Sequence, residues 1–152
     1  MKALLQRVSS AHVSVDQTLI SSIGSGVVVF LAVLRGDGQD QAEWLAHKIV
    51  RYRMFPSDHR PMDLSLADTN GEALVVPQFT LAARTTKGNR PDFSQAMAPN
   101  DAHHLFKHFV NSMQQVHAAV KTGSFQENMQ VSLVNDGPVT ILLSREPTSD
   151  QE

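Results

Sequence analysis

The sequence predicts a single α+β domain, built on a mixed β-sheet with two main helices. A chain of 152 residues suits one domain with a genuine core. Several short apolar, β-branched runs read as strands, and two long stretches carry apolar residues at helical spacing. Because the strands do not alternate strictly with the helices, the order of elements indicates α+β or a mixed sheet.

The first third of the chain reads as strand, turn and strand. Residues 3–15 carry an apolar pattern rich in valine, which is typical of strands. Gly24 and Gly26 then predict a turn. The apolar run at residues 27–31 is continuous, and its short length favours a strand buried on both faces over a helix.

The first helix is expected after the turn at Gly36–Gly38. Its apolar stripe comprises Ala42, Leu45, Ala46, Ile49 and Val50. Asp40 is the expected N-cap, with Glu43 completing a capping box, and the helix should end before Pro56. The polar stretch 57–71 predicts a loop, with a short strand near residues 62–66.

A strand at residues 73–81 precedes the second helix, which Pro99 and Asn100 open. One side of this helix is expected to lie in the core: Ala102, Leu105, Phe106, Phe109, Val110, Met113 and Val116. His104 and His108 are four residues apart and would fit one metal ion. No third ligand is evident, so a solvated helix face is favoured.

A Gly-Pro step interrupts the last strand region, between residues 129–134 and 139–143. Proline has no N–H for a sheet ladder and fixes φ. The stretch Asn135–Thr140 is therefore either a tight turn between two strands or a rigid backbone wedge whose carbonyls face a ligand. Residues 145–152 are polar and contain Pro147, which predicts a flexible tail.

The composition limits the classes of function that this chain can have. Thirteen basic and fifteen acidic residues give a net charge of −2, which argues against broad binding of a phosphate backbone. The absence of cysteine excludes disulfides and thiol nucleophiles. The early charge in the N-terminal segment and the lack of a long apolar run indicate neither a signal peptide nor a membrane span, so a cytoplasmic protein is expected.

Local motifs for known chemistries are few. The chain has no GxSxG elbow, no P-loop and no GxGxxG fingerprint. Thr80 and Thr140 stand in motif-like settings, but no neighbouring base would activate either hydroxyl, and Thr80 taken alone suggests a structural role. Arg84, Lys87 and Arg90 form a local basic cluster, either an ordinary solvated loop or a contact for the end of a nucleic acid.

Three motifs together resemble the D-aminoacyl-tRNA deacylase family. They are Gln78–Leu81, Lys87–Phe93 and Asn135–Thr140, and they occur in the family's order. Further similarities lie at residues 6–8, 122–125 and 129–134, so the resemblance covers residues 1–144 as a single domain. It implies a barrel-like core, an intertwined two-fold homodimer, and no cofactor or metal. The partner it implies is a tRNA acceptor end, with neither a membrane nor another protein.

The activity that the resemblance implies is hydrolysis of the ester between a D-amino acid and the terminal adenosine of tRNA, with glycyl-tRNA also accepted. Gly137 and Pro138 would form a chiral gate that acts in the partner subunit's site. Their cis peptide would present two carbonyls that exclude L side chains. Arg7 would brace this gate through backbone carbonyls.

The resemblance also assigns the other side of the site. Gln78, Phe79 and Thr80 would line the ester, with backbone N–H groups as oxyanion donors. Phe125 and Met129 would hold the terminal adenine. The adenosine 2′-OH would assist the attack, and the basic cluster Arg84, Lys87 and Arg90 would contact nearby phosphates.

The chain departs from the family pattern in two places. Pro77 replaces the usual serine before Gln78, which removes a hydroxyl and an N–H. Residues 126–128 replace a common Gly-Ala-x after Phe125. The alternative is a non-catalytic binder of tRNA ends or nucleotides on the same fold, for which Pro77 is the best argument.

Overall fold

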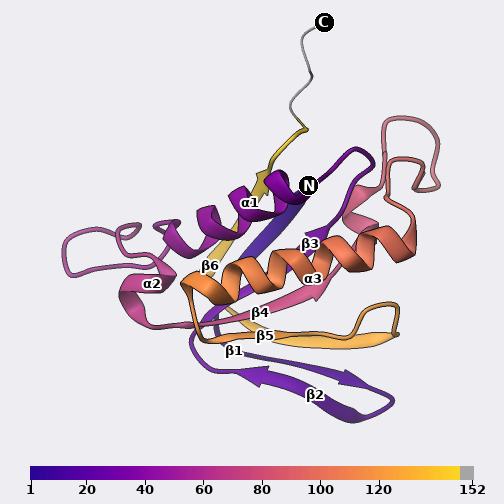
Figure 1. Cartoon of the computed structure of the whole chain (residues 1–152). Helices are drawn as coiled ribbons and strands as arrows, with labels where there is room; N and C mark the ends of the chain where they lie inside the picture. The colour runs from indigo at the N-terminus through magenta and orange to yellow at the C-terminus, as the bar shows by residue number, and fades with distance from the viewer. Residues whose placement is uncertain (148–152) are drawn as a thin grey trace, which may run out of the picture.

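The computed structural model describes residues 1–147 and has the predicted α+β architecture. A mixed, six-stranded sheet is nearly closed into a barrel, and two long helices lie side by side across one face (Figure 1). These helices are α1, Gln39–Arg51, and α3, Pro99–Val116. The two main helices predicted from the apolar periodicity are confirmed.

Strand β1, Lys2–Val15, organises the sheet. Along one edge it pairs antiparallel with β6, Met129–Ser144. Along the other edge it pairs first with β2, Thr18–Ile23, and then with β3, Gly26–Ala32. Since β6 pairs only with β1 among the described strands, its outer edge carries no strand partner.

The parallel part of the sheet follows β3. Strand β4, Glu72–Pro77, is parallel to β3, and the short β5, Val120–Thr122, is parallel to β4. Side chains bring β5 back to β2: Ser21 Oγ donates to the Thr122 carbonyl at 2.8 Å, and Lys121 Nζ to the Ser22 carbonyl at 2.7 Å. These contacts connect the two ends of the strand order β2-β1-β3-β4-β5, where the barrel is nearly closed.

The core lies on both faces of the sheet, so β3 is buried on both sides as its apolar run predicted. Val27 and Val29 face the helices, whereas Val28 belongs to a second cluster with Val8, Leu74 and the partly buried Met129. The helices also meet through His108, whose Nε2 lies 2.8 Å from Glu43 Oε1. His108 is thus engaged in helix packing.

Two strands and one short helix were not predicted. β2 follows a two-residue turn in which Asp16 and Gln17 both have positive φ, of 48° and 65°. Turns with positive φ at both central residues usually contain glycine, which is absent here. β5 has only three residues, too few for a pattern. The helix α2, Leu66–Thr69, begins where Ser65 Oγ accepts from the Asp68 N–H.

The predicted start of α1 is wrong. Gly38 is the N-cap, and its N–H donates to Gln41 Oε1 at 2.8 Å, so Gln41 and not Glu43 supplies the capping side chain. Asp40 lies inside the first turn, where a negative charge favours the positive end of the helix dipole. The end of the helix at Arg51, ahead of Pro56, is as expected.

Three further local predictions need correction. The predicted strand 73–81 ends at Pro77 and is followed by η1, a 3₁₀ helix over Phe79–Ala82. The predicted strand near residues 62–66 is a single bridge between Phe55 and Leu64. Val116, expected in the core, is exposed because it ends α3.

Both ends of the described chain meet beside α1. The Met1 amino group is buried and donates to Asp37 Oδ1 at 2.6 Å and to the Arg145 carbonyl at 2.8 Å. The Arg145 guanidinium lies 4.8 Å from the centroid of the Trp44 ring. Of the expected tail, residues 148–152 lie outside the described part. No helix within residues 1–147 has the length and apolar character to cross a membrane.

Candidate active site

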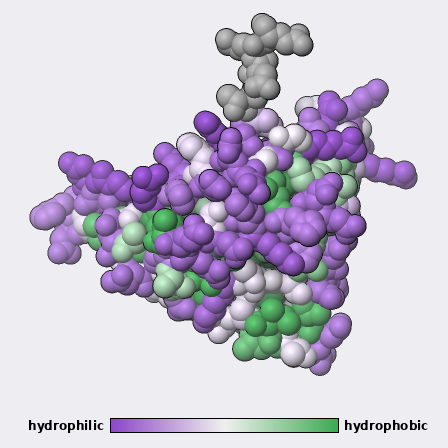
Figure 2. Space-filling view, in the orientation of Figure 1, coloured by the Kyte–Doolittle hydropathy of each residue, from purple (hydrophilic) through white to green (hydrophobic). Residues whose placement is uncertain are grey.

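A groove of about 1070 Å³ opens beside the carboxyl ends of β3 and β4 and the beginning of α3. Its walls are mainly apolar and include three aromatic rings besides that of Phe79: Phe93, Phe106 and Phe125. Such a concave, apolar surface with few polar groups is typical of small-ligand sites. Figure 2 shows hydrophobic surface among hydrophilic side chains on the side of the molecule that carries the loop after η1.

The Gln78-Phe79-Thr80 motif stands at the mouth of the groove. Phe79 is 63% exposed and contacts only one other ring in the described chain, that of Phe93, at 5.2 Å between centroids. The Gln78 N–H donates to the Leu31 carbonyl at 2.8 Å, which ends the sheet ladder after Pro77. Gln78 Nε2 donates to Thr80 Oγ1. The motif therefore presents an aromatic ring and amide groups to the groove from a 3₁₀ turn.

Phe125 and Met129 form the opposite wall of the groove. The Phe125 ring stacks on His103 of α3, with centroids 4.4 Å apart and an interplanar angle of 2°, and also packs on Phe106. Met129 Sδ lies 3.3 Å from the Ser124 N–H. A Cβ on Gly123 would lie only 2.9 Å from this sulfur, so a larger residue there would have to displace the Met129 side chain.

The Gly-Pro motif is an excursion from β6. Gln6 of β1 pairs with Thr140 and Val8 pairs with Asn135, so four residues of β6 lie opposite the single residue between them. The extra residues leave the ladder as an enlarged bulge. Gly137 has φ of +134°, and the Gly137–Pro138 bond is cis, as expected. Both residues are exposed.

Side chains hold the base of this excursion. Asn135 Oδ1 accepts from the Val139 N–H at 2.8 Å, and Asn135 Nδ2 donates to the Val139 carbonyl at 3.2 Å. Arg7 is largely buried; its Nε donates to the Asp136 carbonyl at 3.0 Å and its guanidinium to the Met54 carbonyl at 2.8 Å. Arg7 therefore does contact the motif through a backbone carbonyl.

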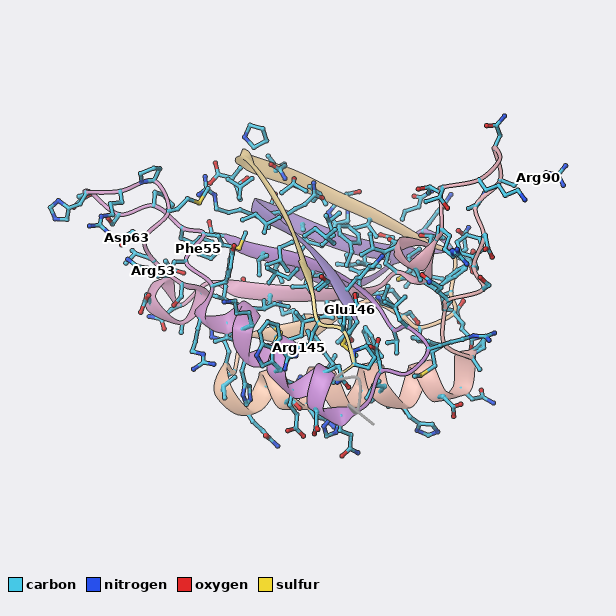
Figure 3. All side chains as sticks on the ribbon, turned by 90° about the horizontal axis from the view of Figure 1, so that it is seen from above. Arg53, Phe55, Asp63, Arg90, Arg145 and Glu146 are labelled. Atoms are coloured by element: carbon cyan, nitrogen blue, oxygen red, sulfur yellow. The ribbon has the colours of Figure 1, made fainter. Side chains whose placement is uncertain are left out.

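The basic cluster lies on an exposed loop. Arg84 and Asp92 pair as an antiparallel bridge at the base of this loop, and Arg90 extends from it into solvent (Figure 3). Hydrogen bonds from the Ser94 N–H and hydroxyl hold the pKa of Asp92 below its ordinary value, with a smaller effect of the Arg84 charge. The base of the loop is closed by the backbone, because the Arg84 N–H donates to the Asp92 carbonyl at 2.8 Å and the Asp92 N–H to the Arg84 carbonyl at 3.2 Å.

The groove unites only part of the expected site. Gln78, Phe79, Phe125 and Met129 line it, whereas Thr80 is adjacent and exposed. The remaining expected residues do not line it: Arg7, Gly137, Pro138, Arg84, Lys87 and Arg90. Within one chain, the groove and the Gly-Pro excursion are thus separate surfaces.

Sequence reasoning missed two residues of this region. Phe93 lies in one of the family-like motifs but was assigned no role, and it contacts Phe79. His103 of α3 does not belong to the apolar side predicted for this helix, yet it stacks on Phe125. Neither contact has a signal in the sequence, because the partners are 14 and 22 residues away and belong to other elements.

Comparisons with known proteins agree on one family. The family model described as D-Tyr-tRNA(Tyr) deacylase matches residues 4–144. Proteins named D-aminoacyl-tRNA deacylase are similar along nearly the whole chain. That of Pelobacter propionicus is 48% identical, covering 95% of this chain and 100% of its own, and that of Geotalea daltonii is 49% identical, covering 97% and 100%.

Solved structures show the same fold. One of a protein named "c-Myc DNA Unwinding Element Binding Protein" superimposes with a TM-score of 0.92 at 38% identity, covering 96% of this chain and 99% of that one. A second, described as a probable eukaryotic D-amino acid tRNA deacylase, has a TM-score of 0.80 at 18% identity, covering 93% and 97%.

Proposed function

The chain belongs to the D-Tyr-tRNA(Tyr) deacylase family and is a hydrolase of the aminoacyl-tRNA ester, and we propose that two copies of it assemble each active site. The groove of one subunit would bind the aminoacylated end of tRNA. The Gly-Pro excursion of the other subunit would enter this groove and test the configuration of the amino acid.

The separation of groove and excursion within one chain carries this proposal. None of the residues Asn135–Thr140 lines the groove, although the family resemblance assigns both to one site. A two-fold dimer removes the discrepancy, because each excursion can then reach the groove of the partner. The outer edge of β6 has no strand partner among the described residues and carries exposed Val134 and Leu142, which suits an interface between copies.

The gate would act by exclusion. Two carbonyls fixed in the groove would collide with an L side chain, while a D side chain would point away from them. Asn135 and Arg7 support such a role because they hold the backbone of the excursion on both sides. Glycine has no side chain to exclude, so glycyl-tRNA would also be hydrolysed.

The aromatic wall suits the terminal adenosine. Phe125 offers an apolar face for stacking, and Met129 offers a polarisable contact, neither of which depends on base-edge hydrogen bonds. Arg84, Lys87 and Arg90 are exposed and would meet phosphates of the acceptor end from the neighbouring loop.

Catalysis would rest on positioning and on the substrate's own 2′-OH. Among the described residues, no serine, threonine, cysteine or histidine lines the groove, and its carboxylates, Asp101 and Glu127, are exposed. Because Leu31 already takes the Gln78 N–H, the oxyanion donors would be the N–H groups of Phe79 and Thr80. The first N–H groups of a helix have no acceptor within it.

Hydrolysis of D-tyrosyl-tRNA and L-tyrosyl-tRNA tests the activity. We expect rapid release of D-tyrosine and negligible release of L-tyrosine. The alternative, a non-catalytic binder, has support in the name of the 38% identical neighbour, which describes a protein that binds a DNA unwinding element. Binding of tRNA without hydrolysis of either ester would favour that alternative.

Mixed dimers test the shared site. Gly137→Ala damages only the gate, and Phe125→Ala damages only the groove, so each homodimer should be weak. A co-expressed mixed dimer has one intact groove facing one intact gate. If subunits pair at random, about a quarter of the wild-type sites should return. Mixtures that stay as weak as the separate variants would contradict a site shared between subunits.

A further inference from the structure

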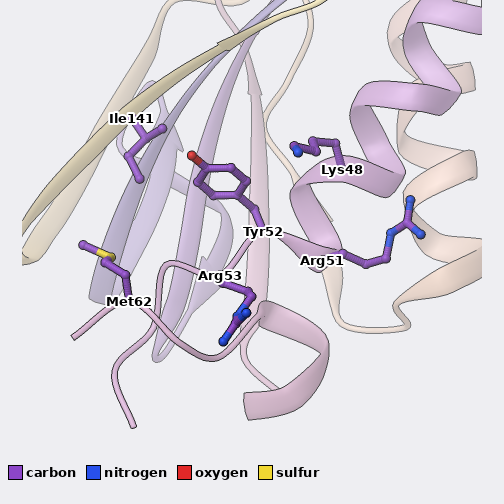
Figure 4. Close-up of a pocket in the computed structure, with 6 residues that line it drawn as sticks. All are labelled: Lys48, Arg51, Tyr52, Arg53, Met62 and Ile141. Carbon is purple, nitrogen blue, oxygen red and sulfur yellow. The ribbon is translucent and has the colours of Figure 1, made fainter. Parts of the chain in front are cut away.

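A second pocket lies at the other end of the molecule, between the end of α1 and the second half of β6. Its volume is about 540 Å³, and its lining consists of Lys48, Arg51, Tyr52, Arg53, Met62 and Ile141 (Figure 4). We call it the α1–β6 pocket. We propose that it binds a phosphodiester group of the tRNA acceptor end, next to the gate that its own subunit presents to the partner.

The charge of the pocket is positive. Three of its six lining residues are cationic: Lys48, Arg51 and Arg53. Of these three, only Arg53 has a carboxylate partner within residues 1–147, which is Asp63. The Lys48 ammonium lies 5.6 Å from the centroid of Tyr52 and 6.0 Å from that of Trp44. Arg51 uses its Nε for the His47 carbonyl, and its terminal nitrogens have no acceptor among residues 1–147. Two cations are therefore left for an anion.

The shape of the pocket suits a nucleotide unit more than a bare anion. In Figure 4, Lys48 and Ile141 lie on opposite sides of the Tyr52 ring, Met62 and Arg53 lie below it, and the Arg51 side chain extends from the end of α1 away from the ring. Tyr52 and Ile141 are half-buried and form an apolar floor. A phosphate beside Lys48 would pair with the ammonium charge, and its sugar or base would pack against the apolar floor at Tyr52.

The position of the pocket ties it to the gate. Ile141 is three residues beyond Pro138 on β6, about 10 Å along a strand. The Arg7 guanidinium bonds both the Asp136 carbonyl of the gate and the Met54 carbonyl, which directly follows the pocket residue Arg53. In the proposed dimer, the aminoacyl end meets this gate, so the pocket would lie within reach of the acceptor end that leads to it.

Arg53 holds the rim of the pocket in place. It donates through Nε to the Asp63 carbonyl at 2.6 Å and pairs with the Asp63 carboxylate, to which Ser57 Oγ also donates at 2.7 Å. This network closes the loop that carries Met62. We therefore assign Lys48 and Arg51 to the phosphate, and Arg53 to positioning.

The test compares two exposed lysines on long helices, Lys48 of the pocket and Lys107 of α3, which lines neither the groove nor this pocket. Lys48→Gln should raise KM for D-tyrosyl-tRNA about three- to tenfold and leave kcat unchanged. It should reduce the salt dependence of kcat/KM by about one charge. Arg51→Gln should act likewise, and Lys107→Gln should change neither quantity.

A minimal substrate separates this site from the proposed function on which it rests. D-Tyrosyl-adenosine has no phosphodiester, so Lys48→Gln should hydrolyse it as well as wild type does. Loss of activity on both substrates, or an unchanged KM and salt dependence on tRNA, would overturn the phosphate site. Wild-type protein that hydrolyses neither substrate would instead overturn the proposed function, and this site with it.

Discussion

The groove and the Gly-Pro excursion are built by opposite means. The groove is an apolar surface of rings and aliphatic side chains, in which Phe79 stays 63% exposed. The excursion has few apolar contacts beyond Val139 and is held by hydrogen bonds from Asn135 and Arg7. Non-directional contacts allow a ligand to enter and leave, whereas directional hydrogen bonds fix the position of backbone atoms.

This difference suggests separate roles: the groove binds the substrate, and the excursion discriminates between the D- and L-esters. Exclusion of one enantiomer needs a rigid obstacle, whereas ligand binding needs exposed surface that the ligand can bury. Changes in the excursion should therefore alter the ratio of D- to L-ester hydrolysis. Changes in the groove should alter KM and leave that ratio as it is.

The largest effect is expected for Gly137→Ala. The residue has φ of +134°, and an added Cβ would lie 2.7 Å from Val139 Cγ2 and 3.0 Å from an Arg7 guanidinium nitrogen. Strain of about 1–3 kcal/mol should displace the gate within the groove, so that its carbonyls also obstruct the D-ester and reduce kcat/KM for it about 10- to 100-fold. The D-to-L ratio should fall, measured by initial rates on both esters.

Gly88→Ala is the matched control for that prediction. Gly88 also has positive φ, of +73°, but nothing lies within 4 Å of the added Cβ. The D-to-L ratio should stay at the wild-type value. If Gly88→Ala and Gly137→Ala lower the ratio equally, general destabilisation rather than gate displacement is the cause.

A smaller effect is expected for Phe125→Ala, which removes the ring that stacks on His103. Loss of base stacking costs about 1–3 kcal/mol, so KM for D-tyrosyl-tRNA should rise about tenfold or more. Phe125→Tyr keeps the ring and should restore the wild-type KM. A fall in the D-to-L ratio with Phe125→Ala would show that groove and gate are not separable.

Thr80→Ala should reduce the single-turnover rate still less, because the Thr80 hydroxyl only accepts a hydrogen bond from Gln78 and Thr80 does not line the groove. Loss of one hydrogen bond, about 0.5–1.5 kcal/mol, corresponds to roughly tenfold at most in single-turnover rate. Substrate ending in 2′-deoxyadenosine should be far poorer for wild type. An inactive, folded Thr80→Ala enzyme, together with a wild type that ignores the 2′-deoxy change, would identify Thr80 as the nucleophile.

The smallest effect concerns the loop beside the gate. Hydrogen bonds from Ser57 and then Arg53 hold the pKa of Asp63 below its ordinary value of 3.8. Because the folded pKa is the lower one, the contribution of this carboxylate to stability is complete above pH 3.8 and is lost as pH falls through the folded pKa. Carboxyl NMR should give an Asp63 midpoint below 3.8, and Ser57→Ala should raise it. A midpoint that Ser57→Ala leaves unchanged would contradict this cause.

The main elements were predictable because their signals are local. The valine-rich run of β3 and the apolar stripes of α1 and α3 depend only on burial of one face or of both, which repeats along the chain. The family motifs were readable for the same reason. Short elements such as β5 have too few residues to carry a pattern, and the 3₁₀ turn after Pro77 replaced a predicted strand.

By itself, the sequence determined the fold class, the family and the residues of its motifs. The tertiary structure decided which of those residues share a surface: Phe79 and Phe125 line one groove, while Arg7 and Gly137 meet at the other end of the molecule. Periodicity indicates whether a side chain is buried, but it does not indicate which residues that side chain packs against. The pairing of β1 with β6, which runs from Val15–Met129 to Lys2–Ser144, joins residues more than 110 positions apart and brings Arg7 to the gate, and no local pattern encodes such a pairing.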